Sequence, residues 1–81
     1  MANVVVMPPF CDEFLGGRRE FAVEAGSILG VLRALDREGP GFAEEAEARA
    51  AIAVDGAVAT DWTVPLAAGS DVLVIPRVAG G

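Results

Sequence analysis

The sequence predicts a small α+β domain, in which one main helix crosses one face of a mixed sheet of four to five strands. Three observations support this. Short β-branched segments with turn signals lie near both ends of the chain, and one segment with helical apolar spacing separates them. The 81 residues are enough for one domain only. A single helix is an economical cover for one apolar sheet face. We expect residues 1–76 to form the domain and residues 77–81 to be a flexible tail.

The first two strands are predicted in the N-terminal third of the chain. Residues 3–7 are short and β-branched, and two prolines end them. Gly16-Gly17 is typical of a turn. Residues 18–24 then alternate, with Phe21 and Val23 on one face and charged residues on the other, which predicts a half-buried strand. The two strands are expected to form a hairpin.

A helix is predicted after Ser27, which is a favoured N-cap residue. Glycine and proline in residues 39–41 end it. Residues 42–50 fit either a second short helix or a solvated linker, and residues 10–15 are expected to be irregular. The apolar stripe that faces the sheet consists of Ile28, Leu29, Val31, Leu32 and Leu35.

The C-terminal half predicts three further strands. Residues 52–54 and 57–59 flank Asp55-Gly56, a dipeptide typical of a tight hairpin turn. Residues 72–75 are all apolar, which predicts a central strand covered on at least one face, and Pro76 ends it.

The composition excludes several classes of function. The chain is 53% hydrophobic and 22% charged, and it has no histidine, lysine or tyrosine, so most familiar catalytic sites are missing. The net charge of −6 disfavours nucleic acid and favours a partner with a basic docking surface. No apolar run approaches the roughly 20 residues of a membrane helix, and no signal peptide is evident. We expect a cytoplasmic protein that binds neither membrane nor metal.

Two single residues have a structural and a functional interpretation. Cys11 is the only cysteine, so an intramolecular disulfide is impossible, and a small apolar role is favoured over a reactive thiol. Trp62 lies in the connecting segment 61–66, and packing is favoured over a role as a surface anchor.

Three C-terminal motifs resemble a known family. Val54-Asp55-Gly56 is similar to its "V-N/D-G" hairpin, and residues 66–72 (LAAGSDV) are similar to "L-x-x-G-D-x-V". Residues 75–81 (IPRVAGG) are similar to "h-P-P-V-x-G-G", where h is apolar. The order and terminal position of these motifs resemble the MoaD/ThiS family of sulfur carriers, which have the ubiquitin-like β-grasp fold. Ser70 and Arg77 depart from the pattern, which bears on the branch and not on the carrier role.

The resemblance implies chemistry at the last residue, Gly81. A partner activating enzyme would use ATP to adenylate this carboxylate, and a sulfur donor such as a persulfide would convert it to a thiocarboxylate. Glycine permits close backbone approach, and five extended residues reach at most about 17 Å into a partner's pocket. The tail-threading residues would be Arg77, Val78, Ala79 and Gly80. The carrier itself would have no catalytic residue and no permanently bound cofactor.

The resemblance also implies an apolar patch on the sheet that docks onto the activating enzyme and onto a larger catalytic subunit or sulfur-acceptor synthase. It places Ile75 and Leu66 in that patch, although both also fit an ordinary core. Molybdopterin synthesis is the favoured pathway, because the compact length of the chain resembles that branch of the family. Four alternatives stay open. One is a carrier for cysteine synthesis, because the Gly16-Gly17 turn resembles that branch of the family. The others are a carrier for thiamine synthesis, a ubiquitin-like modifier and an inert β-grasp interaction module.

Overall fold

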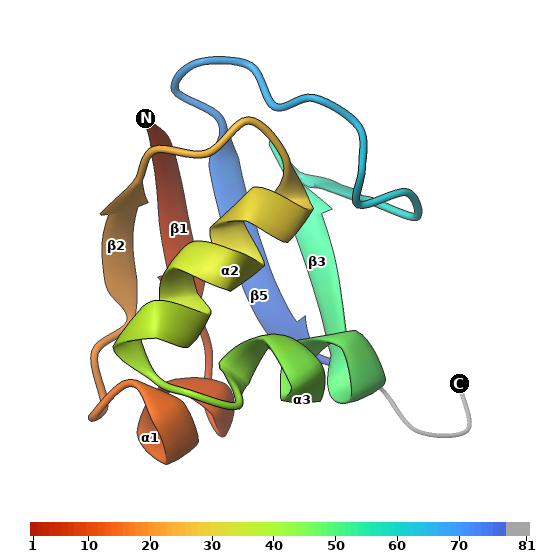
Figure 1. Ribbon diagram of the computed structural model, residues 1–81. Coiled ribbons are helices and arrows are strands. Elements are labelled where there is room, and N and C mark those ends of the chain that lie inside the picture. The colour runs from red at the N-terminus through yellow and green to blue at the C-terminus, as the bar shows by residue number, and fades with distance from the viewer. Residues whose placement is uncertain (78–81) are drawn as a thin grey trace.

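One long helix crosses a five-stranded sheet in residues 1–77, the part of the chain that this computed structural model describes (Figure 1). The elements are β1 (Ala2–Val6), α1 (Phe10–Phe14), β2 (Glu20–Val23), α2 (Ile28–Glu38), α3 (Phe42–Arg49), β3 (Ala50–Val54), β4 (Ala57–Val58) and β5 (Asp71–Pro76). The predicted tail beyond residue 77 lies outside the described residues.

The strand order in the sheet is β2-β1-β5-β3-β4. The pairing of β1 with β5 is parallel, and the other three pairings are antiparallel. The predicted mixed sheet, the first hairpin and the central position of the last strand are therefore confirmed. A mixed sheet of this order with one main helix across it is the β-grasp arrangement.

Helix α2 begins and ends where the sequence predicts. The Ser27 hydroxyl accepts a hydrogen bond from the Gly30 N–H at 3.2 Å, which satisfies one of the free donors of the first turn. At the other end the Gly39 N–H donates to the Leu35 carbonyl at 2.9 Å. Four residues of the predicted stripe are buried, whereas Leu29 is partly buried.

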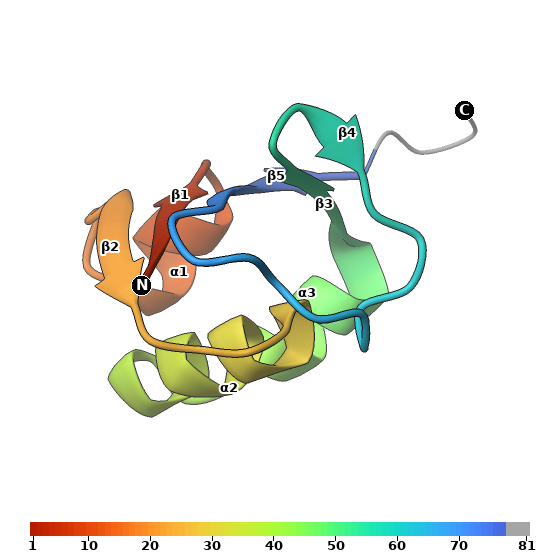
Figure 2. The same ribbon diagram turned by 90° about the horizontal axis from the view of Figure 1, so that it is seen from above.

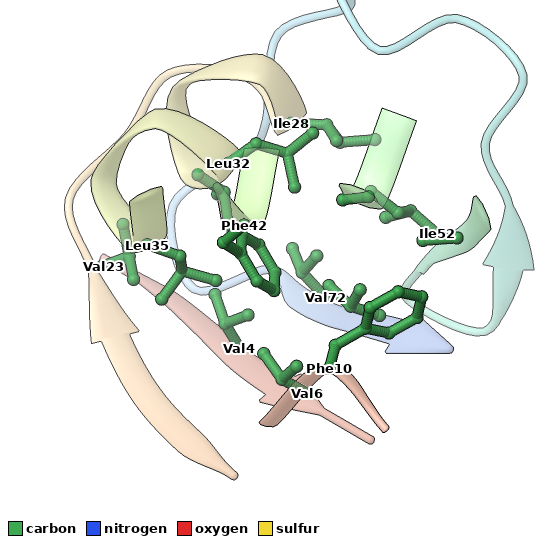
Figure 3. Close-up of a cluster of buried hydrophobic side chains, with 14 of the residues drawn as sticks. Val4, Val6, Phe10, Val23, Ile28, Leu32, Leu35, Phe42, Ile52 and Val72 are labelled. Carbon is green, nitrogen blue, oxygen red and sulfur yellow. The ribbon is translucent and has the colours of Figure 1, made fainter. Parts of the chain in front are cut away.

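The core lies between the sheet and the helices (Figure 3). Alternate residues of β1 and β5 point into it, as the two-residue period of a strand requires. Phe10 and Phe42 fill the end of the core opposite to the start of α2, and their rings meet edge to face with centroids 6.5 Å apart. Cys11 is fully buried in the same cluster, so its predicted role as a small apolar residue is confirmed.

The expectation that residues 10–15 are irregular was wrong, because Phe10–Phe14 form the short helix α1. Phe10 and Phe14 are four residues apart, so one helix face directs both rings toward Phe42. Five residues are too few for a stable isolated helix or a recognisable periodicity. Tertiary burial of these rings stabilises α1, and no local signal reports that burial.

Residues 42–49 form a helix, which decides between the two interpretations that the sequence left open. Phe42 and Ala46 are buried on the face of α3 that contacts the core. The cap comes from another helix, since the Asp36 carboxylate of α2 accepts hydrogen bonds from the Gly41 and Ala43 N–H groups at 3.1 and 3.0 Å.

Candidate functional site

The described part of the predicted tail is Arg77, and it is hydrogen-bonded to the domain. Its backbone N–H donates to the Arg49 carbonyl at 2.7 Å, and its guanidinium donates to the Ala50 carbonyl at 3.1 Å. These two carbonyls lie where α3 ends and β3 begins. From the sequence, Arg77 was expected to thread into a partner's pocket with the rest of the tail. The structure shows that its side chain also fixes the root of the tail on the domain.

The other predicted tail residues lie outside the described part of the chain. These are the attachment residue and its neighbours, Gly81, Gly80, Ala79 and Val78. The site can therefore be described up to its root, and the chemistry of the terminal carboxylate rests on the sequence.

The surface next to the root is acidic and is crossed by one bridging arginine. The Arg49 guanidinium is 2.6 Å from the Glu45 carboxylate and 3.2 Å from that of Glu13, so it links α3 to α1. It also lies 5.7 Å from the centre of the Phe10 ring. Exposed ion pairs contribute little stability. Here they connect α1 to α3 beside the point where Arg77 leaves the sheet.

In the described part of the chain, one face of the sheet carries no helix. Figure 2 shows α2 and α3 on the same side of the strands. Val72 and Val74 of β5 are buried on that side, so the alternate residues Leu73 and Ile75 lie on the opposite face. We call this surface the open face.

The open face is apolar at its centre. Leu73 is paired with Val5 of β1 and with Ala53 of β3, and Ile75 is paired with Ala51. Directly paired side chains lie about 5 Å apart, so these residues form a continuous patch. Ala53 of β3 and Val5 of β1 line a hollow of about 230 Å³ beside Leu73. An uncovered apolar sheet face in a small protein is typical of an interaction surface.

Polar groups border the open face where β3 ends and β5 begins. The Val54-Asp55-Gly56 motif and the 66–72 motif meet at this point. Asp55 and Gly56 have φ angles of 49° and 87°, as a type I′ hairpin turn requires, so the predicted turn is confirmed. The Asp55 N–H donates to the Asp71 carbonyl at 2.8 Å, and the Asp55 carboxylate accepts from the Asp71 N–H at 2.9 Å. Strands β3 and β5 are thereby locked in register.

The two predicted docking residues lie on different surfaces. Ile75 is half-buried on the open face. Leu66 lies in the loop before β5 and packs against the core, and its N–H donates to the Gly26 carbonyl at 2.8 Å. It lines a separate apolar groove with Val58 and Val64, which are both more than half exposed.

Most of the open face was not predicted from the sequence. Leu73, Val5, Ala51 and Ala53 were not named as docking residues. A signal for Leu73 was present, because an all-apolar strand that is covered on one face must expose every second residue on the other. No such signal existed for the two alanines, since only the strand order places them beside Leu73 and Ile75.

Trp62 is a packing residue, as the sequence analysis favoured. It is partly buried against the core, and its indole N–H donates to the Ala59 carbonyl at 3.3 Å. In the same loop, hydrogen bonds from the Thr63 hydroxyl at 2.6 Å and from the Thr63 N–H at 2.9 Å lower the pKa of Asp61. These contacts shape the loop and form no reactive centre.

Two features are absent from residues 1–77. No helix in this range has the length and apolar character needed to cross a bilayer. The same residues contain no group of three or more histidine, cysteine, aspartate or glutamate side chains suited to a metal ion.

Comparison with known proteins gives one family and several similar folds. Residues 13–81 match the model of the ThiS family. No curated protein matches the sequence significantly. CysO of Mycobacterium tuberculosis has a similar structure, with a TM-score of 0.83 and 16% identity over 96% of this chain and 100% of that one.

Two other similar structures are of protein complexes. One is the complex of subunits 1 and 2 of the molybdopterin-converting factor from Helicobacter pylori, with a TM-score of 0.67 and 24% identity over 99% of this chain and 97% of that one. The other is the BexX/CysO complex of Amycolatopsis orientalis, with a TM-score of 0.76 and 15% identity over the full length of both chains. At these identities the likeness shows a shared fold.

Proposed function

Because the chain belongs to the ThiS family, as its C-terminal motifs indicated, we propose that it is a cytoplasmic sulfur carrier. Its Gly81 carboxylate is adenylated and then converted to a thiocarboxylate. The observation that carries the proposal is the match to this family through Gly81, following a root that is fixed on the domain at Arg77. The protein is a co-substrate, and its partner enzymes supply the catalytic groups.

The chemistry needs an activated carbonyl carbon. A carboxylate is a poor electrophile, so the partner enzyme joins it to AMP from ATP and releases pyrophosphate. A sulfur nucleophile then attacks the acyl carbon, and AMP leaves. The product stores sulfur at the end of a glycine tail that is narrow enough to enter a second active site.

The root and the open face support this use in different ways. The hydrogen bonds of Arg77 give the tail a fixed starting point relative to the sheet. The patch of Leu73, Ile75 and Val5 gives a partner an apolar surface on the same sheet. We infer that a partner covers this face while it takes up the tail, and that basic groups on the partner match the acidic surface around the root. This pairing positions the terminal carboxylate without help from a catalytic side chain of the carrier.

Intact mass spectrometry tests the proposal. The full chain is incubated with ATP, bisulfide and a candidate activating enzyme, and a chain that lacks Gly81 is the control. We expect one oxygen to be replaced by one sulfur at Gly81 in the full chain only. An unchanged mass with activating enzymes of the molybdopterin, thiamine and cysteine branches would contradict the carrier function.

We propose molybdopterin synthesis as the pathway, and the test is transfer of the sulfur to a molybdopterin synthase large subunit. Transfer to a cysteine or thiamine synthase instead would assign the protein to that branch. Covalent conjugates with other proteins, seen as a ladder on a denaturing gel, would indicate a ubiquitin-like modifier. Since the chain has no lysine, such a modifier could not form lysine-linked chains of itself.

A further inference from the structure

The outer edge of β2 offers free backbone hydrogen-bonding groups. Within residues 1–77, strand β2 is at the end of the sheet and pairs with β1 alone. The Arg19 carbonyl accepts from the Val6 N–H at 2.7 Å, so Arg19, Phe21 and Val23 direct their backbone groups toward β1. By the same alternation, Glu20 and Ala22 direct theirs to the outside. An edge of this kind is a template for an added strand.

A groove runs along this edge, between β2 and α2. It has a volume of about 390 Å³. Its apolar part comes from Phe21 and Val23 on β2 and from Ala34 and Leu35 on α2. We call it the β2 groove. It lies on the helix side of the sheet, away from the open face, so an occupant there leaves Leu73 and Ile75 accessible.

One end of the β2 groove carries two guanidinium groups. Arg18 and Arg37 both line it, and the ion pairs found among residues 1–77 involve only Arg49. The Arg18 guanidinium lies 4.5 Å from the centre of the Phe21 ring, and its Nε donates to the outward Glu20 carbonyl at 3.1 Å. Arg18 therefore covers part of the free edge, and it leaves the backbone groups of Ala22 open.

The charges along the groove are not uniform. Glu24 and Glu38 also line it. Glu24 is six residues beyond Arg18, which is about 20 Å along an extended strand. Glu38 is the last residue of α2 and directly follows Arg37. The arginine end therefore carries two positive charges and the one negative charge of Glu38, in a chain with a net charge of −6.

We propose that the β2 groove binds an extended peptide segment of a second protein by strand addition. The backbone of the segment pairs with Ala22, its apolar side chains lie against Phe21 and Ala34, and an acidic side chain binds between Arg18 and Arg37. Main-chain pairing supplies affinity in this mode, and the side-chain pockets supply specificity. The surface is separate from the Arg77 root and from the open face, so the carrier can hold this partner while an enzyme processes Gly81.

The test is an NMR titration of the ¹⁵N-labelled full chain with short blocked peptides. The probes are acetyl-Asp-Val-Ile-Val-amide and acetyl-Val-Ile-Val-Asp-amide, because an added strand can run in either direction. The same peptides with lysine in place of aspartate are the charge controls. We expect one aspartate peptide to shift the amide signals of residues 20–24 and 34–38 and to slow hydrogen exchange at the Ala22 N–H.

Three variants distinguish strand addition from non-specific peptide binding. Ala22→Pro removes the outward donor and leaves the β1 pairing intact, and it should weaken binding severalfold. Arg37→Glu should weaken the aspartate peptide about threefold and favour the lysine peptide. Arg33→Glu makes the same charge change on α2 outside the groove and should have no such effect.

Three results would overturn the proposal. They are the absence of shifts in residues 20–24 at about 5 mM of either aspartate peptide, equal shifts with the lysine peptides, or equal effects of Arg33→Glu and Arg37→Glu.

Discussion

Replacing Gly39 by alanine should destabilise the domain at the junction of its three helices. Gly39 is buried between α2 and α3, and a Cβ built there would collide with the Phe14 carbonyl oxygen and lie 2.7 Å from the Phe14 carbonyl carbon. The obstacle is the backbone of α1, which no rotamer change relieves. We expect a loss of about 3 kcal/mol in the free energy of unfolding, at the upper end of the usual cost of overpacking. For a domain of this size, that lowers Tm by roughly 12–24 °C.

Gly26→Ala is the matched control, since its Cβ would meet no atom within 4 Å and its φ is not in the left-handed region. It should be neutral or stabilising by up to about 1 kcal/mol, because alanine restricts the unfolded chain more than glycine does. Urea unfolding followed by the fluorescence of Trp62, the only tryptophan, measures both variants. A Gly39→Ala protein within about 0.5 kcal/mol of the wild type would refute the close contact between α1 and Gly39.

Three further predictions concern the core, the open face and the loop before β5. Phe42→Ala should cost about 3–5 kcal/mol in thermal unfolding, because the side chain is fully buried between two other rings. Ile75→Glu should lower the free energy of unfolding by only about 1 kcal/mol, because the side chain is half-buried. It should reduce the rate of thiocarboxylate formation at limiting activating enzyme at least tenfold, since it places a charge in the apolar docking patch. Thr63→Ala should raise the pKa of Asp61 toward its ordinary value, measured by NMR titration of the carboxylate from about pH 2 to 6.

The sign of the Asp61 effect is fixed by linkage. Its folded-state pKa is lowered, so its contribution to stability is present above the unfolded-state pKa and is lost as pH falls through the folded-state value. Removing the Thr63 hydroxyl should reduce this acid-dependent loss. An unchanged Asp61 pKa in Thr63→Ala would mean that the hydroxyl contact does not form in solution.

The controls for Phe42→Ala and Ile75→Glu are substitutions at a less buried and at an exposed position. Phe14→Ala, at a half-buried ring, should cost less than Phe42→Ala, and an equal cost would contradict the central position of Phe42. Ala48→Glu places the same charge on the exposed side of α3 and should leave carrier activity unchanged. If Ile75→Glu were as active as Ala48→Glu, the open face would not be the docking surface.

The candidate site was predictable only where a local pattern reports it. The glycine tail and its Arg77 root could be named because both lie in one terminal motif. The partners of Arg77 could not, since the carbonyls of Arg49 and Ala50 are 28 and 27 residues away in the chain. The family resemblance assigned both Ile75 and Leu66 to one docking patch. Ile75 lies on the open face, whereas Leu66 lies in a different groove.

The sequence by itself determined the elements that carry a strong local signal. The stripe and caps of α2, the alternation of β2 and the Asp55-Gly56 turn act over a few residues, and each is found where it was expected. Tertiary structure decided the rest. Helix α1 and the root of the tail depend on burial and hydrogen bonds between distant residues. The open face depends on strand order, because Leu73 and Ile75 form a patch only after β5 is inserted between β1 and β3. Contacts between residues so far apart in the sequence are not encoded in local propensities, so only the folded chain reveals them.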